Sequence, residues 1–303
     1  MFVCFRPLGV SLFLLFILSE SVGLQSNNAQ NPAIAARNLP EKSEVPVYLN
    51  EPAVSESSGL ASSRRVPGYF WTHNDSGDTA RVFAFDCDAK RVGVCKLKSA
   101  PAVDWEDMAA FCHNGQNRLL LADCGDNLHK RASISLLIVD EPDPTTDTAT
   151  DQFGAMTVTY PDGPRDCEAV AVDSSRGQVL LLTKSALPIC RVYSIPLSTF
   201  ERPLPFSHAI EASYVGAIAM PMVTGADFDS ATGDLWVVNY WNGFCVRCKD
   251  REMRIADQIR TVPAPVKIPR WRQVEAVAVD DNGRAWVTSE GAPMPFGSVK
   301  MEE

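Results

Sequence analysis

The stretch EAVAVDDNGRAWVTSE, residues 275–290, decides the fold, because altered copies of it recur along the chain. Each copy is an apolar run, a polar turn and a second apolar run. The other four begin at Gly225, Glu168, Glu106 and Ser58. They lie at intervals of roughly 50 to 60 residues, and repeats at such intervals predict an architecture built from like units.

Each copy predicts two β-strands joined by a tight turn. Val277, Val279 and Trp286 are residue types that strands favour, and Asp281-Asn282-Gly283 is a hairpin turn signal. Further strands are expected at residues 133–139, 155–160, 190–195 and 209–218. Four antiparallel strands per unit are typical of a propeller blade. We therefore expect an all-β protein, a β-propeller of five four-stranded blades.

Closure of the ring is assigned to an N-terminal strand. Residues 44–49 (EVPVYL) resemble a strand and could pair into the last blade, which would remove an open sheet edge. Six blades would follow if the long interval between Glu106 and Glu168 contained two short ones. Residues 140–151 are expected to form a long surface loop. Trp71, Trp236 and Trp286 share one repeat position and are expected in the core between blades.

The first residues indicate export. Arg6 precedes an apolar run at residues 8–18, and residues 21–23 read as a cleavage site, so residues 1–23 are expected to be a signal peptide. The run is shorter than the ~20 residues that span a bilayer, which argues against stable membrane insertion. Residues 24–43 are expected to be a flexible lead-in, and residues 44–303 a single propeller domain of a secreted protein, extracellular or periplasmic.

Net charge and cysteine content limit the partners and the cysteine chemistry that we expect for this chain. A net charge of −9 with no basic stripe argues against nucleic acid as a partner. Nine cysteines are present, and Cys4 would leave with the signal. The remaining cysteines of an exported chain favour disulfides, with Cys87–Cys95 one plausible pair among many. Cys245 and Cys248 could alternatively form a redox or zinc motif, although no second Cys-x-x-Cys exists.

Several motifs carry a resemblance: SGLA at 58–61, WTHNDSGD at 71–78, DWEDMA at 104–109, GDN at 125–127, YPDGPRDCEA at 160–169 and TSEG at 288–291. The chain resembles a group of exported bacterial propeller proteins of mostly unassigned activity. More distantly, it is similar to phytase-like, NHL-repeat and gluconolactonase-type propellers. The resemblance covers about residues 45 to 295 and implies the fold. It implies no particular reaction, because one fold hosts many functions.

The repeat also predicts where a site would lie. The first strand of each blade lines the central channel, so residues that open it and residues that close the second strand meet at one channel mouth. The expected metal ligands there are Glu106, Asp123, Asp126, Glu168 and Glu275. The expected ligand-binding residues are Asn74, Asp75, Trp105, Lys184, Asn239, Tyr240 and Glu290. The catalytic candidates are His73, Glu168 and Glu275.

Crowded carboxylates need a bound cation, a raised pKa or basic partners. Ca²⁺ takes six to eight oxygen ligands of the kind gathered here. The basic candidates are Arg165, Lys184, His73 and His129. A structural alternative is that the repeated acidic residues accept hydrogen bonds from backbone amides of the neighbouring blade. The copies also differ, since Ser58 and Gly225 take the Glu position, and Lys184 and Tyr240 take the position of Glu290.

Two functions are consistent with this pattern. The first is a secreted propeller that binds a small polar ligand or an extracellular partner at an acidic mouth, which Ca²⁺ could occupy. The alternative is a metal-assisted hydrolase of the phosphoester (phytase-like) or lactone type, in which the same carboxylates hold the ion and activate water. Phosphate binding would require more Lys and Arg near the mouth than Arg165 and Lys184 supply.

Overall fold

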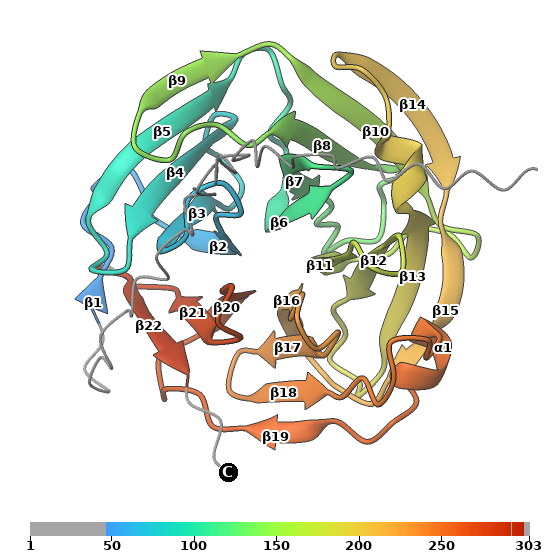
Figure 1. Ribbon diagram of the computed structural model, residues 1–303. Helices are drawn as coiled ribbons and strands as arrows, with labels where there is room; N and C mark the ends of the chain where they lie inside the picture. The colour runs from blue at the N-terminus through green and yellow to red at the C-terminus, as the bar shows by residue number, and fades with distance from the viewer. Residues whose placement is uncertain (1–46, 292, 300–303) are drawn as a thin grey trace, which may run out of the picture. The chain divides into compact units, whose positions relative to one another are not determined.

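Five β-sheets surround a central channel in the computed structural model, which describes residues 47–291 and 293–299 (Figure 1). The innermost strands are β2 (Ser57–Ser62), β6 (Trp105–His113), β11 (Cys167–Asp173), β16 (Val223–Phe228) and β20 (Val274–Val279). Each contacts the next, and β20 contacts β2, so the ring is closed. The protein is a five-bladed β-propeller, as the repeat predicts. The expected signal peptide and lead-in lie outside the described residues.

The strands of each blade run outward in sequence order. Blade 1 continues with β3 (Tyr69–Asn74), β4 (Arg81–Asp86) and β5 (Arg91–Leu97), and blade 2 with β7 (Gln116–Asp123), β8 (Ile134–Asp140) and β10 (Phe153–Thr159). Blade 3 adds β12 (Gln178–Thr183), β13 (Cys190–Pro196) and β15 (Ser213–Ile218), and blade 4 adds β17 (Leu235–Asn239), β18 (Gly243–Val246) and β19 (Ala264–Val266). Blade 5 adds β21 (Ala285–Ser289) and β22 (Pro295–Val299).

The N-terminal strand closes the ring as expected. β1 (Val47–Tyr48) pairs antiparallel with β22, with Val47 opposite Phe296, and completes blade 5. Residues 44–46 of the predicted strand lie outside the described residues. Because the first and last strands of the propeller share one sheet, the edge that β22 would otherwise expose is covered.

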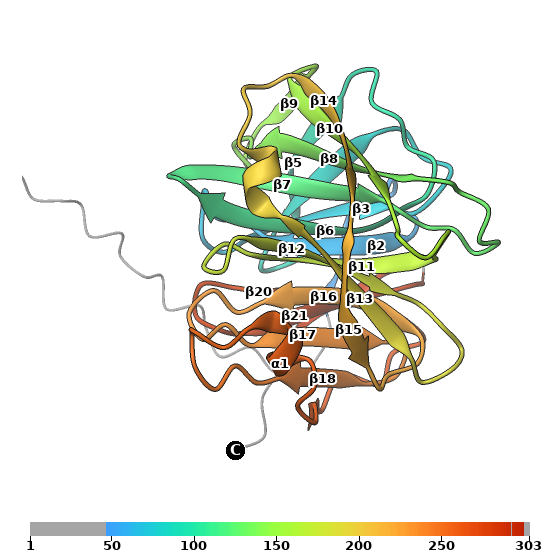
Figure 2. The same ribbon diagram turned by 90° about the vertical axis from the view of Figure 1, so that its right-hand side faces the viewer.

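The long interval before Glu168 holds an exchanged strand rather than a sixth blade. The expected loop at 140–151 contains β9 (Asp147–Thr150), which leaves blade 2 and pairs in parallel with β5 of blade 1. Similarly, the strand expected at 209–218 is broken at Ala212. Its first half, β14 (Phe206–Glu211), pairs in parallel with β10 of blade 2, and its second half is β15 of blade 3. Figure 2 shows β14 and β15 following one another along the outside of the ring. These exchanges tie neighbouring blades together.

The turns of the inner hairpins are held by aspartates. In blade 3, Asp173 accepts hydrogen bonds from the backbone N–H groups of Ser175 and Arg176, and Asp229 and Asp280 act in the same way in blades 4 and 5. Such side-chain-to-backbone bonds are the reason Asp is favoured in turns.

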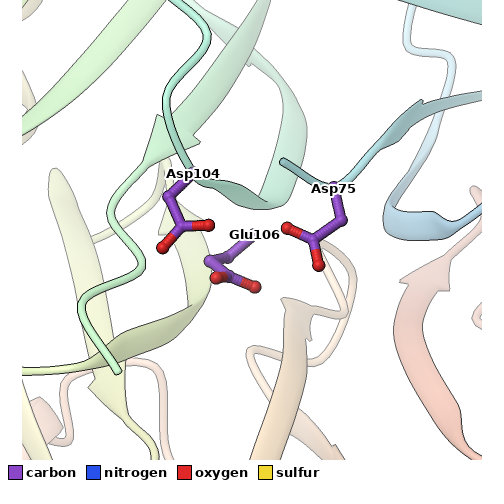
Figure 3. Close-up of side chains that lie close together, drawn as sticks. All are labelled: Asp75, Asp104 and Glu106. Carbon is purple, nitrogen blue, oxygen red and sulfur yellow. The ribbon is translucent and has the colours of Figure 1, made fainter. Parts of the chain in front are cut away.

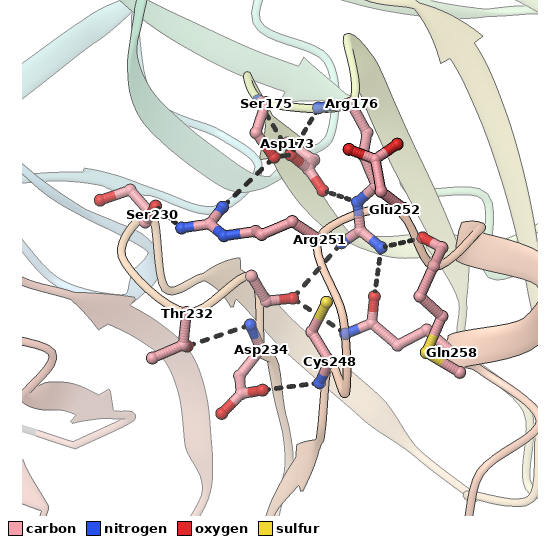
Figure 4. Close-up of polar contacts among 12 residues, drawn as sticks. Asp173, Ser175, Arg176, Ser230, Thr232, Asp234, Cys248, Arg251, Glu252 and Gln258 are labelled. Carbon is pink, nitrogen blue, oxygen red and sulfur yellow. Dashed lines mark hydrogen bonds and ion pairs between the residues drawn. The ribbon is translucent and has the colours of Figure 1, made fainter.

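A polar network joins the turn of blade 3 to the segment that follows β18 (Figure 4). Arg176 binds Asp173 and the Oε1 atom of Gln258, which belongs to helix α1 (Ile255–Gln258). Arg251 donates to the Ser230 carbonyl and to Ser175. The only other helix in the described residues is a single 3-10 turn, η1 (Leu197–Phe200). No helix in residues 47–291 and 293–299 is long and apolar enough to cross a membrane.

The cysteines do not form the expected disulfides. No disulfide is formed among the eight cysteines in the described part of the chain, so the predicted Cys87–Cys95 pair is absent. In the Cys-x-x-Cys segment, the backbone N–H of Cys248 donates to Asp234 and its thiol donates to the Asp250 carbonyl.

The three tryptophans of the repeat, Trp71, Trp236 and Trp286, are buried as predicted.

Candidate functional site

A β-bulge marks the opening of every inner strand. The register between the first and second strands shifts at Ser58, Glu106, Glu168, Thr224 and Glu275, one residue in each of the five blades. A bulge redirects one side chain away from the alternating pattern. The repeated position is therefore a bulged residue. In blade 4 this residue is Thr224, so the alignment that places Gly225 there is wrong by one.

The bulged residues divide into two kinds. The hydroxyl of Ser58 donates to the carbonyl of Glu106 at 2.7 Å, and that of Thr224 donates to the carbonyl of Val274 at 2.8 Å. Both bonds link a blade to its next neighbour. The carboxylates of Glu106, Glu168 and Glu275 instead line one small cavity at the channel mouth.

This cavity gathers side chains from all five blades. Its lining includes six carboxylates and one ammonium group: Glu56, Asp75, Glu106, Glu168, Glu275, Glu290 and Lys184. Ser57, Ser58, Asn127 and Tyr240 complete it. The open volume is about 60 Å³, whereas pockets for drug-sized molecules hold roughly 300–1,000 Å³. The mouth can hold an ion with a few waters, or the tip of a larger polar group.

Three carboxylates converge at one side of the mouth (Figure 3). Asp75 follows β3, Asp104 precedes β6 and Glu106 is the bulged residue, and one oxygen of each lies within 4.8 Å of the others. Burial, followed by the charge of Asp75, raises the pKa of Asp104. A Cβ atom on Gly125 would lie 2.1 Å from Glu106 Oε1 and 2.4 Å from Asp104 Oδ2. Gly125 is therefore what allows these two carboxylates to lie against the backbone.

The opposite side of Glu106 faces Glu168. Burial and then the charge of Glu168 raise the pKa of Glu106, and burial raises that of Glu168 although the Lys184 charge opposes it. Lys184 Nζ lies 2.5 Å from Glu168 Oε1. Burial opposes the Lys184 charge, but the neighbouring Glu168 raises the pKa of Lys184 overall. The predicted pairing of the mouth with Lys184 is thus present. Arg165 instead binds Asp162 at 2.6 Å.

Glu275 forms the third part of the mouth. Burial, followed by the charge of Glu290, raises the pKa of Glu275 to about 8. Gln273 Nε2 donates to Glu275 Oε1 at 3.3 Å and partly offsets this effect. Two glutamates therefore share this corner, as the hairpin geometry predicts.

Two other aspartates meet the structural expectation of amide capping. Asp107 accepts from the backbone N–H groups of Val170 at 2.9 Å and Ala226 at 3.3 Å, in blades 3 and 4. Asp227 accepts from Val279 N–H at 2.8 Å, in blade 5. Both are buried. The capping role belongs to these residues of the inner strands, not to the glutamates at the bulges, and the sequence reasoning missed them.

Several predicted mouth residues have carboxylate or amide groups bonded to nearby backbone. Asp123 accepts from the N–H groups of Val103 and Asp104, and Asp126 accepts from those of Lys130 and Arg131. Asn74 holds residues 55 and 56 in the same way, and Asn239 holds residues 241 and 242. These four side chains shape the loops around the mouth and do not line its cavity.

His73 and Trp105 lie between blades 1 and 2. The His73 ring packs edge-on against Trp105 with centroids 5.3 Å apart, and its Nδ1 bonds the Asn74 carbonyl. Burial lowers the pKa of His73. Trp105 is 2% exposed. Both side chains are packed in the interior, away from the mouth cavity, whereas Trp241 is 60% exposed on the loop beside Tyr240.

The sequence reasoning also missed Asp104 and Glu56. A signal for Asp104 was present, because Asp-x-Glu stands at the opening of two inner strands, at Asp104–Glu106 and at Asp166–Glu168. The aspartates of the two copies have different contacts. Asp104 lies beside Asp75 and Glu106, whereas Asp166 accepts a hydrogen bond from the Asp126 N–H. Only contact geometry separates them.

Fold and site together define a five-bladed propeller with an acidic channel mouth. No family model and no curated protein matches the chain. Among solved structures, it is similar to a chain of the nidogen/laminin complex (11% identity, TM-score 0.44, 80% of this chain and 74% of that one). It is also similar to the extracellular domain of a putative hybrid two-component system from B. thetaiotaomicron (9% identity, TM-score 0.38, 80% of this chain and 27% of that one). These similarities concern the fold.

Proposed function

We propose that this protein is an exported binding propeller whose channel mouth holds a hard divalent cation, Ca²⁺, on Asp75, Asp104 and Glu106. The observation that carries the proposal is the convergence of their oxygens within 4.8 Å. Two carboxylates about 5 Å apart repel by roughly 3 kcal/mol at an effective dielectric of ~20. A cation removes that repulsion.

The surroundings of the three carboxylates favour a bound cation over a basic side chain as the group that neutralises them. Among the described residues, no salt bridge reaches any of the three carboxylates, since Arg131 pairs with Asp123 and Lys184 with Glu168. Three carboxylates can supply up to six oxygens, and water can supply the rest of a Ca²⁺ shell. Asp75 and Glu106 line the cavity of about 60 Å³, which has room for waters of such an ion, and Asp104 lies beside them.

A small polar ligand or an extracellular partner would then bind above the ion, using Glu290, Tyr240 and the rest of the rim. The hydrolase alternative would require positive groups for a phosphoester. Lys184 is the one basic side chain that lines the described mouth, and it is already paired with Glu168. Export rests on the apolar run at residues 8–18.

The test is calorimetric titration of chelator-treated protein with Ca²⁺, accompanied by thermal melts. We expect Ca²⁺ to bind and to raise the Tm. Asp104→Asn should weaken binding at least tenfold, because one of three ligand charges is lost. Gly125→Ala should also weaken it by displacing Asp104 and Glu106. The matched control is Glu252→Gln, an exposed residue after β18, which should leave affinity unchanged. Absence of heat and of a Tm shift at millimolar Ca²⁺ would refute the proposal.

A further inference from the structure

A second cavity of about 390 Å³ lies next to the acidic mouth and shares Lys184 with it. It is formed by the loop after β7, the segment before β11, the loop between β12 and β13, and the loop before β16. Its volume falls in the range of roughly 300–1,000 Å³ that small-molecule pockets occupy. We call it the side pocket.

Part of the lining of the side pocket, here called the basic wall, consists of basic side chains. Arg165, Lys184 and Arg191 line it, together with His129. Arg165 and Lys184 are held by Asp162 and Glu168. Arg191 forms the weakest ion pair of the three. Its Nη1 lies 3.6 Å from Asp162 Oδ2, and its side chain is 44% exposed. Its guanidinium lies 5.9 Å from the centroid of the Tyr214 ring, a contact that does not use its N–H donors.

Acidic groups near this wall are already engaged. Asp166 is the one acidic residue of the lining, and its carboxylate accepts the Asp126 N–H at 2.9 Å. Asp162 accepts from Arg165 and from the Tyr193 hydroxyl. Together with Asp162 and Glu168, Asp166 gives three carboxylates for the three cations of the lining, and Arg191 is the cation with the longest ion-pair distance.

The lining also includes exposed apolar side chains. Leu187 is 64% exposed and Ile189 is 47% exposed, and both line the pocket with Met222. Exposed large apolar side chains grouped at a concave surface are typical of binding sites. Met222 has a φ of 53°, which costs a bulky residue roughly 1–3 kcal/mol, and its N–H is fixed on the Ser185 carbonyl at 2.8 Å.

We propose that the side pocket binds an organic carboxylate with an apolar body, its carboxylate on Arg191 and its body against Leu187 and Ile189. The planar guanidinium matches a carboxylate with two parallel hydrogen bonds. A phosphate dianion fits less well, because Asp162, Asp166 and Glu168 would repel its second charge. The carboxylate can belong to a free acid or to the C-terminus of a peptide. This inference goes beyond the cation site and does not depend on it.

The test uses the full chain and calorimetry with five probes: octanoate, octanamide, octyl phosphate, an acetylated Ala-Leu-Leu peptide with a free C-terminus, and the C-terminal amide of that peptide. We expect at least one free carboxylate to bind and its amide to bind at least tenfold more weakly. Octanoate binding assigns a free acid, and binding of the peptide alone assigns a chain terminus. Equal binding of acid and amide, or tighter binding of octyl phosphate, would overturn the inference.

Variants separate this site from the mouth. Arg191→Gln should weaken carboxylate binding tenfold or more, and Leu187→Ser should weaken it several-fold. Arg254→Gln, at an exposed arginine paired with Asp257, is the control and should stay within twofold. Asp104→Asn should weaken Ca²⁺ binding at least tenfold and leave octanoate affinity unchanged, so the two proposals can fail independently. An unchanged affinity in Arg191→Gln, or no binding of any carboxylate at millimolar concentration, would refute the side pocket.

Discussion

Carboxylates in the wall of the channel and carboxylates at its mouth have opposite surroundings. Asp107 and Asp227 face backbone N–H groups of other blades. Asp75, Asp104 and Glu106 face one another. Both groups come from the same inner strands or the loops beside them. The difference teaches that the role of a carboxylate does not follow from its position in the repeat. It follows from whether hydrogen-bond donors surround it.

The energetic consequences differ accordingly. A buried carboxylate with N–H donors stabilises the folded chain, because removing it leaves those donors unpaired. A carboxylate among carboxylates destabilises the folded chain until a cation or a proton arrives. Substitutions in the two regions should therefore change stability in opposite directions.

The largest effect is expected for Asp107→Ala. This change removes the acceptor that joins blade 2 to blades 3 and 4 and leaves buried N–H groups of Val170 and Ala226 unpaired. We expect the free energy of unfolding in urea to fall by about 3–5 kcal/mol. The matched change at the mouth, Asp75→Ala, should cost less than about 0.5 kcal/mol or stabilise the protein without added cation. Equal losses in the two variants would remove the distinction between the regions.

The sequence is sufficient for the fold because the fold depends on a pattern repeated five times. Apolar alternation, turn residues such as Asn282-Gly283, and the closing strand at Val47–Tyr48 are all local signals. The exchanged strands β9 and β14 could not be predicted in the same way. Each pairs with a blade to which it does not belong in sequence, and no local preference records such a partner.

The site was predictable in place but not in detail. Hairpin geometry brings Glu106, Glu168 and Glu275 to one mouth. It cannot show that Asp123 and Asp126 turn to backbone N–H groups, since that depends on the path of two loops. Nor could it show that the repeated position is a bulge, because one added residue shifts the register without changing composition.

A smaller effect is expected in the pH dependence of stability. Burial and Glu290 raise the pKa of Glu275 from 4.5 to about 8 in the folded protein. The folded state then binds more protons than the unfolded state between these values, so the free energy of unfolding falls as pH rises from 4.5 to 8. Glu275→Gln should remove about 2–3 kcal/mol of that fall, which is roughly half of the ~5 kcal/mol that the full change in pKa would give, because solvent at the mouth screens the charges. Urea denaturation at several pH values measures it.

Glu252→Gln is the control. It should show the wild-type dependence of the free energy of unfolding on pH, since Glu252 is exposed. If Glu275→Gln left the pH dependence of the free energy of unfolding unchanged, the mouth would not raise the pKa of Glu275. Added Ca²⁺ should also flatten the wild-type profile, because a cation replaces the proton as the neutralising charge.

The smallest effect separates residues that share the bulge position. Ser58→Ala removes the hydrogen bond to the Glu106 carbonyl, and Thr224→Val removes the one to the Val274 carbonyl. Each should lower the free energy of unfolding by about 1 kcal/mol. Glu106→Gln, at the equivalent bulge, should not lower it, because the change relieves repulsion among carboxylates. Ser76→Ala, at an exposed serine, is the control. If Glu106→Gln lost as much stability as Ser58→Ala in urea titrations, Glu106 would belong to the fold, and the cation site would lose a ligand.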